Sequence, residues 1–131
     1  MNAHPDELKY SETHEWVRID DDGHAVVGIT EHAQEKLGEV VFVELPDEDI
    51  SVNAHDEVCV VESVKAAADI YTPLSGKIVA VNEDLLDAPG LINTDPYGDG
   101  WLYKIKIKDM DEYKQLLDAD DYKEITSEDE D

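Results

Sequence analysis

Residues 57–82 read EVCVVESVKAAADIYTPLSGKIVAVN, and the rest of the chain can be interpreted from this stretch outward. A valine-rich run is followed by a break of small residues that holds Lys65, and a second run ends at Pro73. A third run follows Ser75-Gly76. Runs of β-branched residues bounded by proline and glycine are typical of strands. The stretch therefore predicts a tight hairpin followed by a third strand, with Lys65 at the hairpin tip.

The tip has an unusual composition for a turn. If Lys65 and Ala66 are its two central residues, Glu62 faces Asp69 across the hairpin, and like charges directly opposite each other destabilise a sheet. Tight hairpins usually place Asn, Asp or Gly at these positions. A lysine among small residues is thus a poor choice for turn formation alone, but it leaves the amine accessible to a modifying enzyme. The plain alternative is an ordinary exposed lysine.

Composition limits the classes of partner. The chain has 131 residues, with 34 Asp and Glu against 10 Lys and Arg, for a formal net charge of −24. Such a surface repels phosphate groups, so neither nucleic acid nor anionic membrane is expected as a partner. Basic docking faces on other proteins would be attracted to it. An acidic surface selected for solubility, including solubility at high salt, explains the charge equally well.

The ends and the single cysteine add little chemistry. Residues 1–7 lack the patterns of signal and transit peptides, and no apolar run reaches the length of a membrane span. We therefore expect a cytoplasmic protein, or an organellar one from which a transit peptide has been removed. Cys59 lies in a valine-rich run, so we interpret it as a small buried hydrophobic residue.

Outside the hairpin the pattern is mainly that of strands. Residues 14–29 predict two strands around a turn at 20–23, and Thr30 and Gly38 are the expected caps of a helix over 31–37. Further elements are expected as strands at 40–45, 50–52 and 101–108, a brief helix at 87–92 and a C-terminal helix starting after Asp109. In the last strand Trp101, Tyr103, Ile105 and Ile107 alternate with Leu102, Lys104, Lys106 and Lys108.

We expect residues 9–125 to form a single domain, between a mobile N-terminus at 1–8 and a disordered acidic tail at 126–131. No catalytic site is predicted within it. The five histidines show no paired spacing that would predict a metal site, and the glycines near Gly100 lack the context and lysine of a phosphate loop. Lys65 is therefore the one residue that the sequence singles out for chemistry.

The hairpin resembles a known one. Glu62-Ser63-Val64-Lys65-Ala66-Ala67-Ala68-Asp69-Ile70-Tyr71-Thr72-Pro73, followed by residues 75–82, is similar to the lipoylation hairpin of the H protein of the glycine cleavage system. Three further blocks agree in order: Leu8-Lys9-Tyr10 with His14-Glu15-Trp16-Val17, then Gly28-Ile29-Thr30-Glu31-His32-Ala33-Gln34, then Pro89-Gly90-Leu91-Ile92-Asn93 with Pro96-Tyr97 and Gly100-Trp101. The resemblance runs from about residue 8 to residue 122.

The resemblance implies a fold and a cofactor. The fold is a two-sheet sandwich or flattened barrel, of the barrel-sandwich hybrid type found in lipoyl domains, with a short N-terminal helix and a C-terminal helix. Lipoate would be attached through an amide to Lys65, so 9–125 would be a lipoyl-carrier domain. The residues expected to present the hairpin to the attaching enzyme are Glu62, Ser63, Val64, Ala66 and Asp69.

The resemblance also implies a cycle in which the chain carries and other proteins catalyse. A glycine decarboxylase that uses pyridoxal phosphate loads the aminomethyl group, an aminomethyltransferase removes it, and dihydrolipoamide dehydrogenase reoxidises the dithiol. A fourth partner attaches lipoate, and the carrier is expected to be a monomer. The loaded amine would need a cleft that excludes water and a carboxylate to pair with. The family analogy assigns these roles to Glu15 and Asp69, with His32 and Thr13 as weaker candidates.

Alternatives stay open from the sequence. Glu15 could be a surface residue and Asp69 a turn residue. The chain could be an H-like protein that relays lipoate, a lipoyl or biotinyl domain of another complex, or an unmodified acidic interaction protein. It departs from the family pattern at Ala68, where serine is common, and at Asn53-Ala54-His55-Asp56, which replaces a turn that contains glycine. These departures affect the cleft and a loop, whereas the attachment block is intact.

Overall fold

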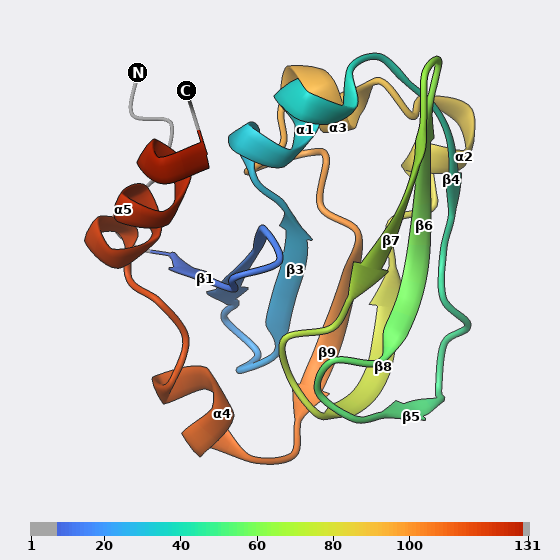
Figure 1. Cartoon of the computed structure of the whole chain (residues 1–131). Coiled ribbons are helices and arrows are strands. Elements are labelled where there is room, and N and C mark those ends of the chain that lie inside the picture. The colour runs from blue at the N-terminus through green and yellow to red at the C-terminus, as the bar shows by residue number, and fades with distance from the viewer. Residues whose placement is uncertain (1–7, 130–131) are drawn as a thin grey trace.

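The computed structural model describes residues 8–129, and for 127–129 only the backbone. Two antiparallel sheets make up most of it: six strands in the order β1-β2-β3-β9-β8-β5 and three in the order β4-β6-β7 (Figure 1). The predicted fold class, mainly β with two sheets, is confirmed. The strands are β1 Lys9–Tyr10, β2 Glu15–Ile19, β3 Ala25–Ile29, β4 Val40–Glu44, β5 Ser51–Val52, β6 Glu57–Ser63, β7 Ala67–Tyr71, β8 Gly76–Val81 and β9 Tyr103–Ile107.

Five helices lie around the two sheets in the described part of the chain: α1 Glu31–Leu37, α2 Asp84–Asp87, α3 Leu91–Thr94, α4 Met110–Lys114 and α5 Ala119–Asp129. The predicted caps of α1 are confirmed. The Thr30 hydroxyl accepts a hydrogen bond from the Ala33 N–H, and Gly38 ends the helix with φ of 83°. A positive φ is cheap only for glycine, which is why the helix stops there.

The central stretch divides between the two sheets. The β6–β7 hairpin belongs to the three-stranded sheet, whereas β8 pairs with β9 and β5 in the six-stranded sheet. The chain crosses from one sheet to the other over Thr72, Pro73 and Leu74, all of which are buried. The three strands predicted from residues 57–82 are therefore confirmed, but they do not form one meander.

The core lies between the sheets. Its buried apolar residues come from both of them, and include Val17, Val27, Val43, Val61, Ile70, Ile78 and Ile105. Cys59 is among them, and burial raises the pKa of its thiol to about 12. The prediction that Cys59 is a buried hydrophobic residue is confirmed. A second cluster, which contains Tyr10, Trp16 and Tyr122, lies where α5 covers β1.

Two local predictions are wrong. The brief helix expected over 87–92 is replaced by α2 and α3, with Pro89 in the turn between them. Proline cannot donate the backbone hydrogen bond that would make the two turns continuous. Leu102 was expected to share a face with the lysines, but it is fully buried because β9 begins only at Tyr103.

The C-terminal helix and the tail also differ from expectation. The expected C-terminal helix is interrupted after α4, where Leu117 exchanges two backbone hydrogen bonds of 2.8 Å with Tyr10. Helix α5 then runs to Asp129. The first four residues of the tail expected to be disordered, 126–129, are thus helical. At the other end, Leu8 is buried, and the expectation of a mobile N-terminus otherwise falls on residues 1–7, outside the described residues.

Between residues 8 and 129, none of the helices is both long enough and apolar enough to cross a membrane.

Gly76 tests the packing at the start of β8. A Cβ at this position would lie 2.1 Å from the backbone oxygen of Lys106 on β9, so Gly76→Ala has to push two paired strands apart. We expect the free energy of unfolding to fall by about 2 kcal/mol, as in other overpacked sites. Urea denaturation measures it. Gly90→Ala is the control, because nothing lies within 4 Å of that Cβ, and its change should stay within about 0.5 kcal/mol. Equal stabilities of the two variants would contradict the packing argument.

Candidate functional site

Lys65 lies at the tip of the β6–β7 hairpin and is exposed. The two loop residues are Val64 and Lys65, because the Ser63 N–H donates to the Ala66 oxygen at 2.7 Å. The Ser63 hydroxyl accepts from the N–H groups of Lys65 and Ala66 at 3.3 and 3.1 Å. Neither loop residue has a positive φ. The serine side chain therefore closes a turn that contains no Asn, Asp or Gly.

The predicted register of the hairpin is wrong, because the two loop residues are Val64 and Lys65 and lie one position earlier than the predicted pair, Lys65 and Ala66. Glu62 pairs with Ala67, and Asp69 pairs with Val60. The sequence had placed Glu62 opposite Asp69, but that like-charge pair does not form. The acidic neighbour of Asp69 is instead Glu57, whose pKa is raised, first by the charge of Asp69 and then by its own desolvation. Avoiding the direct Glu62–Asp69 pairing is a reason for the sheet to prefer the observed register.

The hairpin tip is held against the loop between α1 and β4. The Val64 N–H donates to the Glu39 oxygen at 3.0 Å. The stem of Lys65 passes over Gly38, where an added Cβ would lie 3.3 Å from Cε of Lys65. Gly38 thus leaves room for the lysine, and the backbone of the tip is fixed while the amine stays accessible.

Glu15 occupies a buried position between the two sheets. It is 1% exposed, and its carboxyl accepts hydrogen bonds from the hydroxyls of Ser11 and Thr13, each 2.5 Å long. The backbone of Tyr71 on β7 also lies close enough to lower the pKa of this carboxyl, so β2 of the large sheet and β7 of the small one approach each other here. Burial raises the pKa of Glu15 to about 7, although the hydrogen bonds act in the opposite direction. The alternative of a surface role for Glu15 is wrong.

Sequence analysis missed three polar residues in this region: Ser11 and Tyr103, which lie close to Glu15, and Thr72. Ser11 lies four positions before it and reaches the same carboxyl oxygen as Thr13. Tyr103 is fully buried, and it lies close enough to Glu15 for the charge of that carboxyl to raise its pKa, with burial as the larger cause. Thr72 is also fully buried, and its hydroxyl donates to the Leu74 oxygen at 2.8 Å. Only the spacing Ser-x-Thr-x-Glu could have drawn attention to Ser11, because Thr72 and Tyr103 are distant in sequence.

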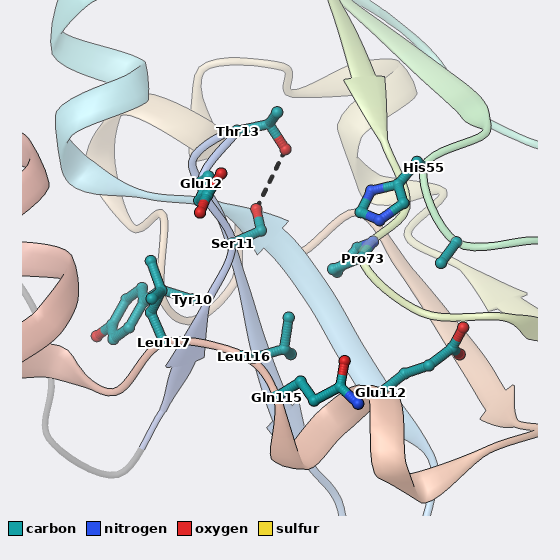
Figure 2. A pocket seen from close by; sticks show the side chains of 11 residues that line it. Tyr10, Ser11, Glu12, Thr13, His55, Pro73, Glu112, Gln115, Leu116 and Leu117 are labelled. Atoms are coloured by element: carbon teal, nitrogen blue, oxygen red, sulfur yellow. Dashed lines mark hydrogen bonds between the residues drawn. The ribbon is translucent and has the colours of Figure 1, made fainter.

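A cavity of about 530 Å³ opens next to this polar group (Figure 2). Ser11 and Thr13 line it, so two of the hydroxyls that donate to Glu15 also face open space. The rest of the wall is contributed by Tyr10, Glu12, Ala54, His55, Pro73, Glu112, Gln115, Leu116 and Leu117. The wall thus combines apolar side chains with hydrogen-bonding groups, which suits an apolar chain that ends in a polar group.

His55 connects this cavity with a departure noted in the sequence. It has φ of 76°, and its N–H donates to the Thr72 oxygen at 2.6 Å. The turn therefore keeps the left-handed conformation that a glycine would adopt most easily, with histidine in its place.

Of the four residues predicted to form the cleft, the structure brings two together. Glu15 and Thr13 are hydrogen bonded, whereas Asp69 is exposed on β7, between the hairpin tip and Tyr71. His32 is buried on α1 beside the ring of His14, with the ring centroids 4.8 Å apart. His14 is in turn 2.7 Å from the hydroxyl of Tyr122 on α5. The contacts of His32 thus place it in a histidine and tyrosine cluster that joins α1 to α5.

One group of potential metal ligands is found in the described residues, although the sequence predicted no metal site. Asp20, Asp22 and His24 lie in the β2–β3 turn with ligand atoms within 4.8 Å of one another. Asp20 already accepts the N–H groups of Asp22 and His24 at 2.9 Å each and pairs with Lys104 at 3.3 Å. These contacts are those of an ordinary aspartate turn.

Comparison with known proteins gives one consistent result. The family model described as "Glycine cleavage H-protein" matches residues 8–129. A glycine cleavage system H protein of Pseudoalteromonas atlantica is 59% identical over 122 residues, which are 93% of this chain and 95% of the relative. One from Aeromonas hydrophila is 56% identical over 128 residues, 98% of this chain and 99% of the relative. The crystal structure of an H protein from Mycobacterium marinum matches with a TM-score of 0.86 at 40% identity, over 94% of this chain and 98% of that one.

The raised pKa of Glu15 predicts a specific dependence of stability on pH. Between its usual value of 4.5 and about 7, the folded state holds a proton on Glu15 that the unfolded state has lost. The contribution of Glu15 to the free energy of unfolding is therefore largest below pH 4.5, decreases as the pH rises and becomes constant above pH 7. We expect wild type to lose up to about 3 kcal/mol relative to Glu15→Gln over that interval. Urea denaturation of both proteins at a series of pH values isolates this effect from the other carboxylates. A constant difference would contradict the shifted pKa.

Proposed function

The chain belongs to the glycine cleavage H-protein family and is a lipoyl carrier of the glycine cleavage system, and we propose that Lys65 is the residue to which lipoate is attached. The support is the position of Lys65, an exposed amine at the tip of a hairpin whose backbone is pinned at Ser63 and Glu39. An enzyme can enclose such a tip without disturbing the core. Glu62, Ser63, Val64, Ala66 and Asp69 lie within four residues of Lys65 along the hairpin and would present its amine to the attaching enzyme.

The described residues fit a lipoyl arm. Strand β7 runs from Ala67 beside the tip to Tyr71, about 13 Å at the usual rise per residue. A lysine extended by lipoate has about 14 bonds from Cα to its far sulfur and spans roughly 17 Å at standard bond lengths. Because Lys65 lies two residues before β7, the arm covers most of the length of that strand in the direction of the cavity beside Glu15. When bound, lipoate supplies a dithiolane that accepts the aminomethyl group of glycine.

We propose that Glu15 holds the amine of that load. Ser11 and Thr13 orient its carboxyl, and a pKa of about 7 leaves it close to half ionised near neutral pH. An incoming ammonium group would favour the ionised form and so complete a buried ion pair with hydrogen-bonded partners. Asp69 would offer a second carboxylate on the way along β7, and Thr13 would hold the carboxyl of Glu15 in place. The contacts of His32 support only an indirect role through α1 and α5.

We further propose that catalysis belongs to the partners. The chain works with other components of the glycine cleavage system, and we propose that these are glycine decarboxylase, the aminomethyltransferase and dihydrolipoamide dehydrogenase, together with a lipoate-attaching enzyme. A tether of this kind raises the local concentration of the reacting group for each enzyme in turn. We place this activity in the cytoplasm and the carrier as a monomer.

Replacing Lys65 tests the attachment site. Lys65→Arg keeps the charge but removes the nucleophilic amine, so we expect the lipoyl mass adduct to be lost and glycine-dependent exchange of labelled CO₂ by the decarboxylase to fall to background. Intact mass spectrometry and the exchange assay measure these two quantities. Lys77→Arg, at another exposed lysine, is the control and should retain both. An adduct that persists in Lys65→Arg would reject the site, and an adduct without exchange in wild type would favour the lipoate-relay alternative.

A second experiment tests Glu15. Glu15→Gln should leave lipoylation intact but release the aminomethyl load to water about tenfold faster, the effect of losing one charge-assisted hydrogen bond. The measurement is the decay of loaded protein, followed by mass after removal of the decarboxylase. Glu12→Gln, at an exposed neighbour that also lines the cavity, should decay as wild type does. Identical decay of all three proteins would reject the role assigned to Glu15.

A further inference from the structure

The three-stranded sheet has a second face, which points away from the core. Side chains alternate along its strands, so Val43, Cys59, Val61 and Ile70 point inward and their neighbours point outward. We call the outward set the outer face; it consists of Phe42, Glu44, Glu57, Val60, Glu62, Ala67, Asp69 and Tyr71, with Glu57 paired to Tyr71 across the bulge in β6. In Figure 1 helices α4 and α5 lie on the opposite side of the molecule from β4 and β6.

Apolar surface is exposed where the outer face meets the hairpin tip. Phe42 is 51% exposed and Val41 48%, because a bulge between Val40 and Phe42 turns two consecutive side chains toward solvent. Val64, beside Lys65, is 67% exposed. Phe42 on β4 pairs with Glu62 on β6, and Glu62 is two residues before Val64 at the tip. Phe42 and Val64 are therefore near each other on the surface. Grouped apolar side chains at the surface of a soluble protein often mark a contact with another protein.

The same face is crowded with negative charge. Glu44 pairs with Val60, which pairs with Asp69, and Glu57 lies close enough that the charges of Asp69 and Glu44 both raise its pKa. No ion pair links Glu44, Glu57, Glu62 or Asp69 to another residue whose side chain the structure describes. Like charges held together in this way cost stability unless a partner neutralises them.

We propose that the outer face is the surface on which the chain docks with glycine decarboxylase, through a recess on that enzyme that is apolar at its centre and lined with Lys and Arg at its rim. Phe42 enters the recess, and Glu44 and Glu57 meet the basic rim. This inference rests on the proposed function, since it assumes that the enzyme acts on an arm at Lys65. A second copy of this chain fits poorly, because it would set carboxylates against carboxylates.

The position of the cavity favours the enzyme that loads the arm. Ser11 and Thr13 line the cavity and donate to Glu15, and none of the cavity's lining residues belongs to the outer face. A decarboxylase that covers the outer face therefore leaves the cavity open to receive the load at once. An enzyme that removes the load has to reach the cavity side instead.

Phe42→Ser tests the apolar centre. With the lipoylated chain as substrate and decarboxylase that contains pyridoxal phosphate, we expect KM for the chain to rise about tenfold, as for loss of a central apolar contact, with kcat unchanged. Met110→Ser, at a similarly exposed residue on α4, is the control and should stay within about twofold, because that helix lies outside the outer face. Intact mass confirms beforehand that every variant is fully lipoylated.

The double variant Glu44→Gln, Glu57→Gln tests the charges. Its association rate with the decarboxylase should fall, and should depend less steeply on salt than that of wild type. Asp120→Asn with Glu124→Gln removes the same number of exposed charges from α5 and controls for net charge. Equal salt dependence of the two double variants would count against a basic rim.

The proposal is overturned if the Phe42→Ser chain serves the decarboxylase as well as the Met110→Ser chain does. It is also overturned if Phe42→Ser affects only the reaction with the aminomethyltransferase, the dehydrogenase or the attaching enzyme, or only self-association measured by sedimentation. The test is separable from that of Lys65. Binding of the decarboxylase to a Lys65→Arg chain, with and without Phe42→Ser, reports on docking even when no arm is present. Conversely, the lipoyl adduct reports on Lys65 whatever happens at Phe42.

Discussion

The crossing of the chain from the small sheet to the large one is the constraint on which the rest of the structure depends. It is fixed from several sides: the Thr72 hydroxyl donates to the Leu74 oxygen at 2.8 Å, and Ser75 donates through both its N–H and its hydroxyl to Glu112 on α4, each at 2.8 Å. Gly76 then lets β8 approach the backbone of β9. Because the crossing is rigid, the hairpin before it projects in one direction while the strand after it helps to build the core.

The same crossing makes the buried polar site. It leaves β7 as an edge strand, and the carboxyl of Glu15 on the opposite sheet lies close enough to the backbone of Tyr71 for that backbone to lower its pKa. A buried acid is costly when ionised, and the hydroxyls of Ser11 and Thr13 offset part of that cost. The result is a carboxyl poised near neutrality beside a cavity. Such a group can serve both the sheet interface and a cationic guest, and the two roles share one set of hydrogen bonds.

The charge of the chain is distributed in a way that separates its faces. Lysines on β8 and β9 find carboxylates, as in the Lys104–Asp20 and Lys77–Asp49 pairs, whereas the outer face of the small sheet carries carboxylates around exposed apolar side chains. On the proposed docking, the net charge of −24 serves recognition as well as solubility. It leaves one face suited to a basic partner and makes contact between two copies of that face unfavourable.

The sequence by itself determined the elements that depend on neighbours along the chain. These include the hairpin with Lys65 at its tip, helix α1 between Thr30 and Gly38, and the buried state of Cys59, because alternation, capping and turn residues are local signals. Its local predictions failed where a single residue shifted the outcome, as with the Ser63 hydroxyl that moved the turn and Pro89 that split a helix. Only the tertiary structure decided that β8 leaves the hairpin's sheet, that Glu15 is buried, and that Tyr103 lies close to it. Those arrangements arise from hydrogen bonds and packing between segments far apart in sequence, which no local pattern records.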